Sequence, residues 1–264
     1  MNDLIDMHCH LGLMANGEEV AAAAFDRNVL IFNNTVSPAD WQAERRVFAS
    51  FPNVTTGFGM HPWWVADGTA DEEQCLELLE AWEPRVIGEV GLDLGSRHQA
   101  TAADQQRVLA AIARWAGRAG GRLVSLHAVH AAAEVLDILE DSGAAESCRC
   151  IFHWFSGPSD QLKRAIADGC FFSCGPRMLR TGKGREYVKA IPAERLLLET
   201  DLPAEQGDRC TFDELCGQLQ SAGEAIAAIK GPEALQVIAD TSEALLALHS
   251  PLAERFAGGF ESFR

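Results

Sequence analysis

Short apolar runs recur along the whole chain, and each is followed by a polar turn and then by a longer stretch rich in alanine or leucine. Eight of the runs have the length of a strand. Their apolar residues are consecutive rather than alternating, which is typical of strands buried on both faces of a parallel sheet. The pattern predicts strands at residues 4–10, 29–32, 54–58, 85–93, 123–127, 150–153, 170–174 and 196–201.

Helical segments are predicted between these strands. Ser37 and Pro38 are typical of a helix start, with serine as the cap and proline in the first helical position. Gly120 and Gly121 are typical of a helix end. The predicted helices cover residues 18–27, a segment that begins at 37, then 69–82, 100–118, 131–140, 158–167, 184–190, 212–229 and 232–248.

The alternation of strands and helices predicts an α/β fold, specifically a TIM (β/α)8 barrel. Eight strand–helix units in 264 residues fit that architecture, which typically takes about 250 residues. No low-complexity tract or change of composition divides the chain, so we expect residues 1–264 to form a single domain. A doubly wound open sheet, which shares the alternation, is the alternative.

The composition is acidic, with a net charge of −16 and only four lysines, so the surface should repel long polyanions. No apolar run reaches the roughly 18 residues of a membrane span, and the N-terminus lacks the basic start of a signal peptide. The eight cysteines are scattered without a C-x-x-C pair. We therefore expect a cytoplasmic protein with reduced thiols and no membrane partner.

Polar residues at the strand ends supply the candidate chemistry. The period of two in the first strand places His8 and His10 on one side and Cys9 on the other. Two adjacent imidazoles can bind one divalent cation, although a polar turn explains that pair alone equally well. Active sites of TIM barrels lie at the C-terminal ends of the strands. Seven residues share that layer and so predict one metal site: His8, His10, His61, Glu89, His127, His153 and Asp201.

Six short motifs occur in one order along residues 6 to 203. They are Asp6-Met7-His8-Cys9-His10, Gly59-Met60-His61-Pro62, Gly88-Glu89-Val90-Gly91-Leu92-Asp93, Ser125-Leu126-His127, His153-Trp154-Phe155-Ser156-Gly157 and Glu199-Thr200-Asp201-Leu202-Pro203. Each motif is weak by itself, and the six in order are specific. With them the chain resembles the TatD family of metal-dependent hydrolases, within the amidohydrolase superfamily.

The resemblance implies a hydrolase with two divalent cations. The implied ligands are His8, His10 and Asp201 for the first cation, His127 and His153 for the second, and Glu89 as a bridge between them. A binuclear hydrolase of this kind needs mostly neutral nitrogen ligands, which leave the cations Lewis acidic. A site rich in imidazole favours zinc, with manganese, nickel or iron next, over magnesium, which prefers oxygen ligands.

The sequence also indicates roles for His61 and for several residues near the predicted ligands. His61 would lie beside the cations and donate to a substrate oxyanion, or it is simply fixed in a turn by the proline that follows. Glu199 and Asp6 each precede a ligand by two residues and would support it from deeper in the barrel. For Asp93 a surface or capping role is as consistent as a site role, and Trp154 could line the pocket or pack against a helix.

The chain also departs from the family pattern. Many members carry an arginine two residues after the histidine of the fifth strand, where this chain has Val129. An arginine there would be a natural phosphate clamp. Its absence weakens the inference from family to nuclease and leaves the metal site unchanged.

Three functions are therefore compared. The first is a metal-dependent phosphodiesterase, a deoxyribonuclease acting on DNA ends or short oligonucleotides, in which metal-activated water attacks phosphorus. Its catalytic residues would be Asp201 as the proton acceptor, Glu89 and His61. The second function applies the same machinery to a small amide, lactone or phosphoester. The third is a non-enzymatic metal or protein-binding scaffold. The sequence carries no prediction of the oligomeric state.

Overall fold

The computed structural model describes residues 4–66 and 68–249, in which eight strands form one parallel sheet in chain order. Each strand pairs with the next along the chain, which is the connectivity of a (β/α)8 barrel. The predicted TIM barrel is confirmed, and the single domain remains a prediction. The strands are β1 (Ile5–Cys9), β2 (Leu30–Asn34), β3 (Val54–Met60), β4 (Val86–Asp93), β5 (Leu123–Val129), β6 (Arg149–His153), β7 (Phe171–Cys174) and β8 (Leu196–Leu198).

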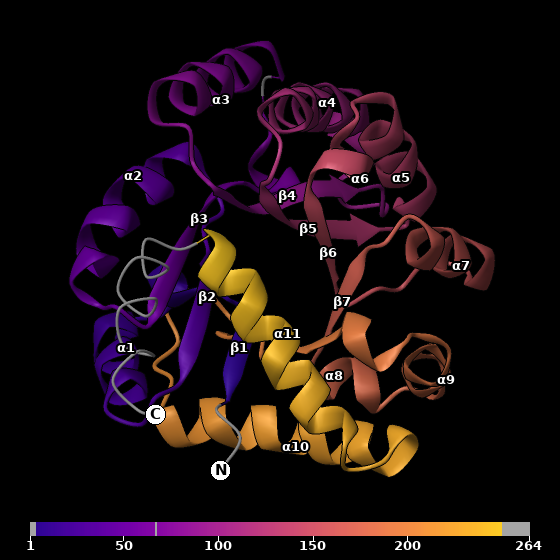
Figure 1. The fold of residues 1–264 in the computed structure, drawn as a ribbon. Helices are drawn as coiled ribbons and strands as arrows, with labels where there is room; N and C mark the ends of the chain where they lie inside the picture. Colours follow the sequence, from indigo (N-terminus) through magenta and orange to yellow (C-terminus); the bar gives the residue numbers. More distant parts are fainter. Residues whose placement is uncertain (1–3, 67, 250–264) are drawn as a thin grey trace.

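The helices surround the barrel, and the last one crosses its end (Figure 1). They are α1 (Gly17–Phe25), α2 (Pro38–Val47), α3 (Gly68–Trp82), α4 (Ala102–Ala119), α5 (Ala132–Asp141), α6 (Ala144–Ser147), α7 (Ser159–Ala167), α8 (Pro176–Leu179), α9 (Gly182–Ala190), α10 (Phe212–Lys230) and α11 (Ala234–His249). Ser37 caps α2 as predicted, because its side chain accepts a hydrogen bond from the backbone N–H of Asp40. Of the helices described, none is both long and apolar enough to cross a membrane.

Two local predictions differ from the structure. The eighth strand was expected to run to residue 201, but β8 ends at Leu198. Asp201 has a φ of +56°, which is outside the extended region, so the strand conformation cannot continue through it. The short helices α6 and α8 were not predicted, because four residues are too few for helical periodicity to appear in a sequence.

The barrel is closed between β8 and β1 by hydrogen bonds to the Asp6 side chain. The Asp6 carboxylate accepts bonds from the backbone N–H of Thr200 at 3.0 Å and from its hydroxyl at 2.6 Å. One residue further on, the N–H of Asp201 donates to the carbonyl of His8 at 2.9 Å. Burial raises the pKa of Asp6 to about 7, although these bonds oppose the rise. These hydrogen bonds form the β8–β1 seam, which holds Asp201 beside His8 and His10.

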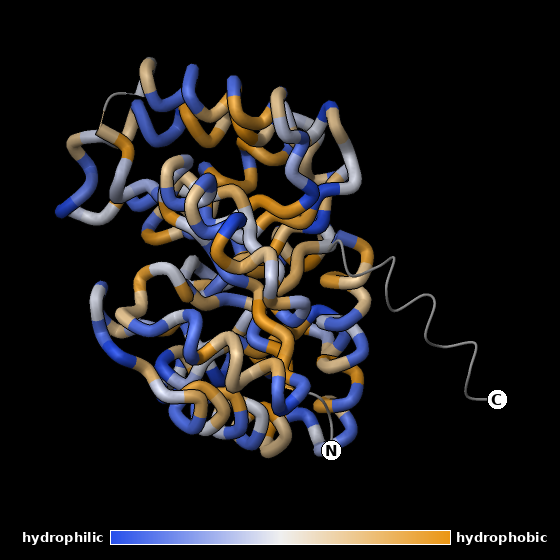
Figure 2. Tube along the Cα trace, turned by 90° about the vertical axis from the view of Figure 1, so that its left-hand side faces the viewer, coloured by the Kyte–Doolittle hydropathy of each residue, from blue (hydrophilic) through white to orange (hydrophobic). Residues whose placement is uncertain are grey.

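Apolar side chains fill two regions of the molecule. The larger region lies between the strands and the surrounding helices. Figure 2 shows hydrophobic segments gathered in the interior and hydrophilic turns on the outside of the helices. The smaller region fills the barrel at the end where the strands begin. It contains the first residues of four strands and two leucines of α11: Ile5, Val86, Leu123, Phe171, Leu245 and Leu246. Helix α11 therefore closes this end of the barrel.

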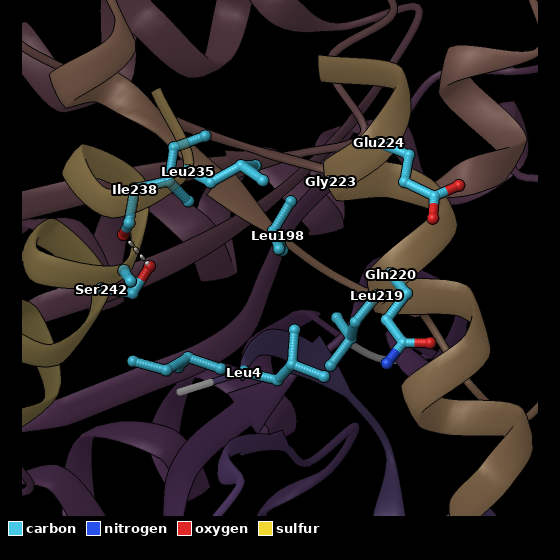
Figure 3. A pocket seen from close by; sticks show the side chains of 11 residues that line it. Leu4, Leu198, Leu219, Gln220, Gly223, Glu224, Leu235, Ile238 and Ser242 are labelled. Carbon is cyan, nitrogen blue, oxygen red and sulfur yellow. Dashed lines mark hydrogen bonds between the residues drawn. The ribbon is translucent and has the colours of Figure 1, made fainter. Parts of the chain in front are cut away.

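An apolar pocket lies on the outside of the barrel wall, between the start of β1, β8 and helices α10 and α11. Figure 3 shows Leu198, Leu219 and Leu235 converging on it from β8 and the two helices. None of the predicted ligand residues lines this pocket. This apolar pocket is therefore separate from the predicted metal site.

The closing role of α11 leads to a test with a matched pair of leucines. Leu246 is buried in the barrel end, whereas Leu248, two residues along the same helix, is 64% exposed. We expect Leu246→Ala to lower the free energy of unfolding by about 2–5 kcal/mol, because it leaves a cavity. Leu248→Ala should change it by less than about 0.5 kcal/mol. Urea denaturation of the metal-free proteins measures both values, and equal effects would contradict this account of α11.

Candidate metal centre

All seven predicted residues meet at the ends of the strands. His8, Glu89, His127 and His153 lie in the strands β1, β4, β5 and β6, and the others directly follow β1 and β3 or lie three residues after β8. All except Asp201 are buried. Three groups have ligand-type atoms within 4.8 Å of one another: His8 with His153 and Asp201, His8 with His10 and Glu89, and His61 with Glu89 and His127.

The carboxylate of Glu89 is the centre of this cluster. Its Oε1 lies 2.8 Å from His127 Nδ1 and 2.9 Å from His153 Nε2. Its Oε2 lies 3.3 Å from His8 Nε2 and 3.4 Å from His10 Nε2. Each oxygen therefore faces a different pair of histidines. Burial alone would raise the pKa of Glu89, but the surrounding histidines hold it well below its usual range, so the carboxylate is ionised.

An irregularity in β4 aims Glu89 into the barrel. The register with β3 and with β5 shifts between Ile87 and Val90, on either side of Gly88 and Glu89. Such bulges redirect a side chain out of the simple alternation of a strand. Gly91 then allows β5 to approach closely. It has a φ of +152°, and a Cβ atom there would lie 2.0 Å from the carbonyl oxygen of His127.

Asp201 completes the side of the cluster that faces the β8–β1 seam. Its Oδ1 lies 3.6 Å from His10 Nε2 and 3.9 Å from His8 Nε2. Burial alone would raise the pKa of Asp201, but the hydrogen bond from His10 and the charges of nearby histidines lower it to about 2. The carboxylate is therefore ionised at neutral pH, the form that can bind a cation or accept a proton.

The spacing of the ring nitrogens fits bound cations. His8 Nε2 and His10 Nε2 are 3.3 Å apart, and His127 Nδ1 and His153 Nε2 are also 3.3 Å apart. Two nitrogens that bind one tetrahedral cation at about 2.0–2.1 Å would be separated by about 3.3 Å. His10 donates its Nδ1–H to the carbonyl of Asn34 at 2.8 Å, so Nε2, which faces Glu89 and Asp201, is the nitrogen that would bind a cation. These residues can therefore hold divalent cations.

The electrostatic environment of the histidines agrees with that fit. Burial lowers the pKa of His8 to about 4, so its ring is neutral, as a metal ligand must be. Burial would also lower the pKa of His10, but the bond to Asp201 and the charge of Glu89 raise it to about 9. In the same way, Asp93 and Glu89 raise the pKa of His127 to about 9 against the effect of burial. The surroundings of His10 and His127 therefore stabilise positive charge, and a bound cation would take the place of the protons on the ring nitrogens that face it.

Two buried carboxylates lie behind the histidines of β5 and β6. Asp93 Oδ2 is 3.6 Å from His127 Nε2, and Glu199 Oε2 is 3.9 Å from His153 Nδ1. The carboxylate of Glu199 also accepts a hydrogen bond from the hydroxyl of Ser173. Neither nitrogen makes a hydrogen bond at these distances, but a carboxylate in this position can orient the ring of a metal-binding histidine. Asp93, for which the sequence left the role open, is thus part of the site.

Both roles expected for His61, in a turn and beside the cluster, fit the structure. Its Nδ1 accepts a hydrogen bond from the N–H of Trp63 at 3.2 Å, so the ring does cap the turn Pro62–Trp64. Its Nε2 also lies 3.5 Å from Glu89 Oε1, inside the cluster. Burial lowers the pKa of His61 to about 4, so the ring is neutral. Because Nδ1 is the acceptor, Nε2 carries the proton and is a donor aimed at the site.

Asp6 and Trp154 are neighbours of predicted ligands in the sequence, and the contacts of their side chains are of other kinds. Asp6 accepts a bond from the backbone N–H of His8 at 3.2 Å and otherwise holds the β8–β1 seam. It therefore supports the position of His8 through the backbone rather than through the ring. Trp154 is partly buried and packs against the main apolar core.

Two residues of the site were not predicted. Ser125 Oγ lies 3.0 Å from His8 Nδ1. Ser125 precedes His127 by two residues, so the period of the strand could have placed it on the same face. Arg177, in α8, has its Nη1 3.7 Å from Asp201 Oδ2. No sequence pattern predicts that α8 brings the Arg177 side chain to the site.

Known proteins are similar to this chain in sequence and in fold. The human protein named Deoxyribonuclease TATDN3 is 28% identical over 272 residues, which cover 94% of this chain and 95% of that protein. A protein of Escherichia coli named 3'-5' ssDNA/RNA exonuclease TatD is 29% identical, over 70% of this chain and 72% of its own. The crystal structure of YJJV, a TatD homolog from Escherichia coli, superposes with a TM-score of 0.74 at 22% identity and covers 92% of this chain and 97% of its own.

The family can be assigned on nearly the whole described chain. A protein of Mycobacterium tuberculosis named as a metal-dependent hydrolase TatD is 28% identical over 221 residues, covering 76% of this chain and 80% of that protein. The model of the family described as TatD related DNase matches residues 5–249, which include every motif that carries the resemblance. The chain therefore belongs to the TatD related DNase family and is a metal-dependent hydrolase.

Proposed function

We propose that this hydrolase is a two-metal phosphodiesterase that cleaves DNA at ends or in short single strands. The observation that carries the proposal is the Glu89 carboxylate, whose two oxygens face two separate pairs of histidines. Such an arrangement suits a pair of cations that share one carboxylate, as in two-metal phosphoester hydrolysis. The names of the human and Escherichia coli relatives support a nucleic-acid substrate.

The residues that face each oxygen of the Glu89 carboxylate indicate which ligands would bind each cation. His8, His10 and Asp201 would hold one cation, because they lie together at the β8–β1 seam. His127 and His153 would hold the other cation, and Glu89 would bridge the two. Four imidazoles and two carboxylates favour zinc, with manganese, nickel, iron or magnesium as alternatives.

The residues around the cations would have separate tasks. When bound, the cations supply the Lewis acidity that activates water and offsets charge on the phosphoryl oxygens. The ionised Asp201 would accept the proton from the attacking water. The Nε2–H of His61 would donate to a non-bridging oxygen of the phosphate. Arg177, whose side chain is partly exposed, would contact the adjacent phosphate and so take the place of the arginine that is missing at Val129.

The second function, hydrolysis of a small amide, lactone or phosphoester, would use the same residues. A labelled single-stranded oligonucleotide and a generic amide therefore form the direct test, each assayed with and without a chelator. Metal-dependent cleavage of the oligonucleotide supports the proposal. Turnover of the amide alone would favour the second function, and no turnover of either would favour a metal-binding scaffold. A cytoplasmic location remains a prediction.

The ligand set predicts about two equivalents of cation per chain after loading with zinc or manganese. Glu89→Ala should lower this number sharply, because both cations lose a shared ligand. Chelation should also lower the melting temperature, since a cation that binds only the folded state stabilises it. Elemental analysis and thermal denaturation measure both effects. One equivalent or less in the fully loaded native protein would contradict the binuclear site.

Asp201→Asn separates catalysis from assembly, because it keeps the shape and one coordinating oxygen but removes the basicity. We expect kcat for oligonucleotide cleavage to fall by at least roughly a hundredfold, the usual scale for a general base. Circular dichroism and metal content should stay close to native values. Near-native turnover would mean that another group accepts the proton.

The small number of cationic groups at the site predicts weak dependence on salt. Each phosphate that is neutralised contributes a slope of about −0.7 in log affinity against log salt for single strands. With Arg177 and the two cations as the main contacts, we expect a slope of roughly −1 to −2 for a short strand. Arg177→Gln should flatten it by about 0.7. Arg118→Gln, which removes a 65% exposed charge on α4, is the control and should not change it. A slope typical of six or more phosphate contacts would reveal a basic channel.

A further inference from the structure

Three aromatic rings lie nearly parallel beside the metal centre. The rings of Trp63 and His98 are stacked, with centroids 5.0 Å apart and planes within 9°. The rings of Trp63 and Trp64 have centroids 6.3 Å apart and planes within 13°. At 6.3 Å, near-parallel rings are offset rather than in full face-to-face contact, which leaves part of their surface open. Trp63 is 52% exposed and Trp64 is 40% exposed, so a second flat ring can reach them from solvent.

The aromatic step, defined as Trp63, Trp64 and His98, is held by two residues next to the proposed ligands, Asp93 and His61. The indole N–H of Trp63 donates to Asp93 Oδ2 at 2.6 Å, and the same oxygen faces His127. The ring of His61 meets both indoles edge-on, with centroids 4.9 Å and 5.4 Å away. A large apolar side chain that is both exposed and held in one orientation is typical of a binding surface rather than of a mobile surface residue.

The charge of the chain favours an uncharged flat ligand at this step. With a net charge of −16, the protein cannot hold a nucleic acid through many phosphate contacts. Stacking of bases on aromatic side chains supplies affinity that does not depend on charge and that tolerates every base, because each base has a π-face. The ring contacts to His61 and His127 place the step next to the position where the phosphate would be cleaved.

We propose that the aromatic step binds, by stacking, the nucleobase next to the phosphodiester that is cleaved. The inference rests on the proposed nuclease function, and it specifies the part of the substrate that the metal centre does not contact. Because a duplex keeps its bases stacked on one another, the step favours single strands and frayed ends. Trp63 and Trp64 are thus specificity residues, and their contact is with the base rather than with the reacting atoms.

The test measures binding of a short single strand whose phosphorothioate linkages resist cleavage. The intact strand is compared with a series of strands of the same length, each of which lacks the base at one position. Fluorescence anisotropy with the zinc-loaded full chain gives the dissociation constants. We expect the absence of one particular base to weaken binding about tenfold or more. Trp63→Ala and Trp64→Ala should bind the intact and that abasic strand equally, at the weaker affinity. Trp64→Ala leaves the bond between Trp63 and Asp93 in place, so it separates stacking from any disturbance of the site.

Trp82→Ala is the matched control. Trp82 is 51% exposed, which is close to the value for Trp63. It is the last residue of α3, shortly before the start of β4, and therefore lies at the end of the barrel opposite to the site. It should keep the full difference between intact and abasic strands. If the native protein cleaves oligonucleotides but binds all strands of the series equally, the aromatic step is overturned while the nuclease function stands. If no nucleic acid is bound or cleaved, both fail. A difference that persists in both tryptophan variants would also overturn the step.

Discussion

The buried carboxylate of Glu89 is the interaction on which the site depends. A lone ionised carboxylate in a protein interior is strongly disfavoured, and here five histidines surround it and keep it ionised. Those histidines come from strands β1, β5 and β6 and from the segments after β1 and β3, so they meet only when the barrel is closed. The irregular register of β4 and the glycine at position 91 are the local adjustments that bring the carboxylate to this point.

Barrel closure and site assembly use the same residues. Asp6 binds the backbone and hydroxyl of Thr200, and the next residue, Asp201, then lies against His8. The opposite end of the barrel is filled by apolar side chains. There α11 covers an apolar core with Leu245 and Leu246. This division, with chemistry at the ends of the strands and stabilising contacts at their beginnings, is general among TIM barrels.

The sequence predicts the parts of the molecule that follow local rules. Consecutive apolar runs predict the strands, and polar residues at the strand ends predict which side chains converge. Features that depend on tertiary contacts could not be predicted. Strand β8 ends before Asp201, whose φ is +56° and whose N–H bonds across the seam to the carbonyl of His8, a partner nearly 200 residues away in the chain. Arg177 reaches the site from a four-residue helix, and the exposed orientation of Trp63 depends on Asp93.

The most direct test of this account is the position of the cations relative to Glu89. Crystals of the zinc- or manganese-loaded protein, measured at the absorption edge of the metal, would reveal each cation as an anomalous peak. The account predicts two peaks about 3.5–4 Å apart, one on each side of the Glu89 carboxylate. One should lie among His8, His10 and Asp201, and the other between His127 and His153. A single peak, or a peak away from Glu89, would contradict the bridging carboxylate and the mechanism built on it.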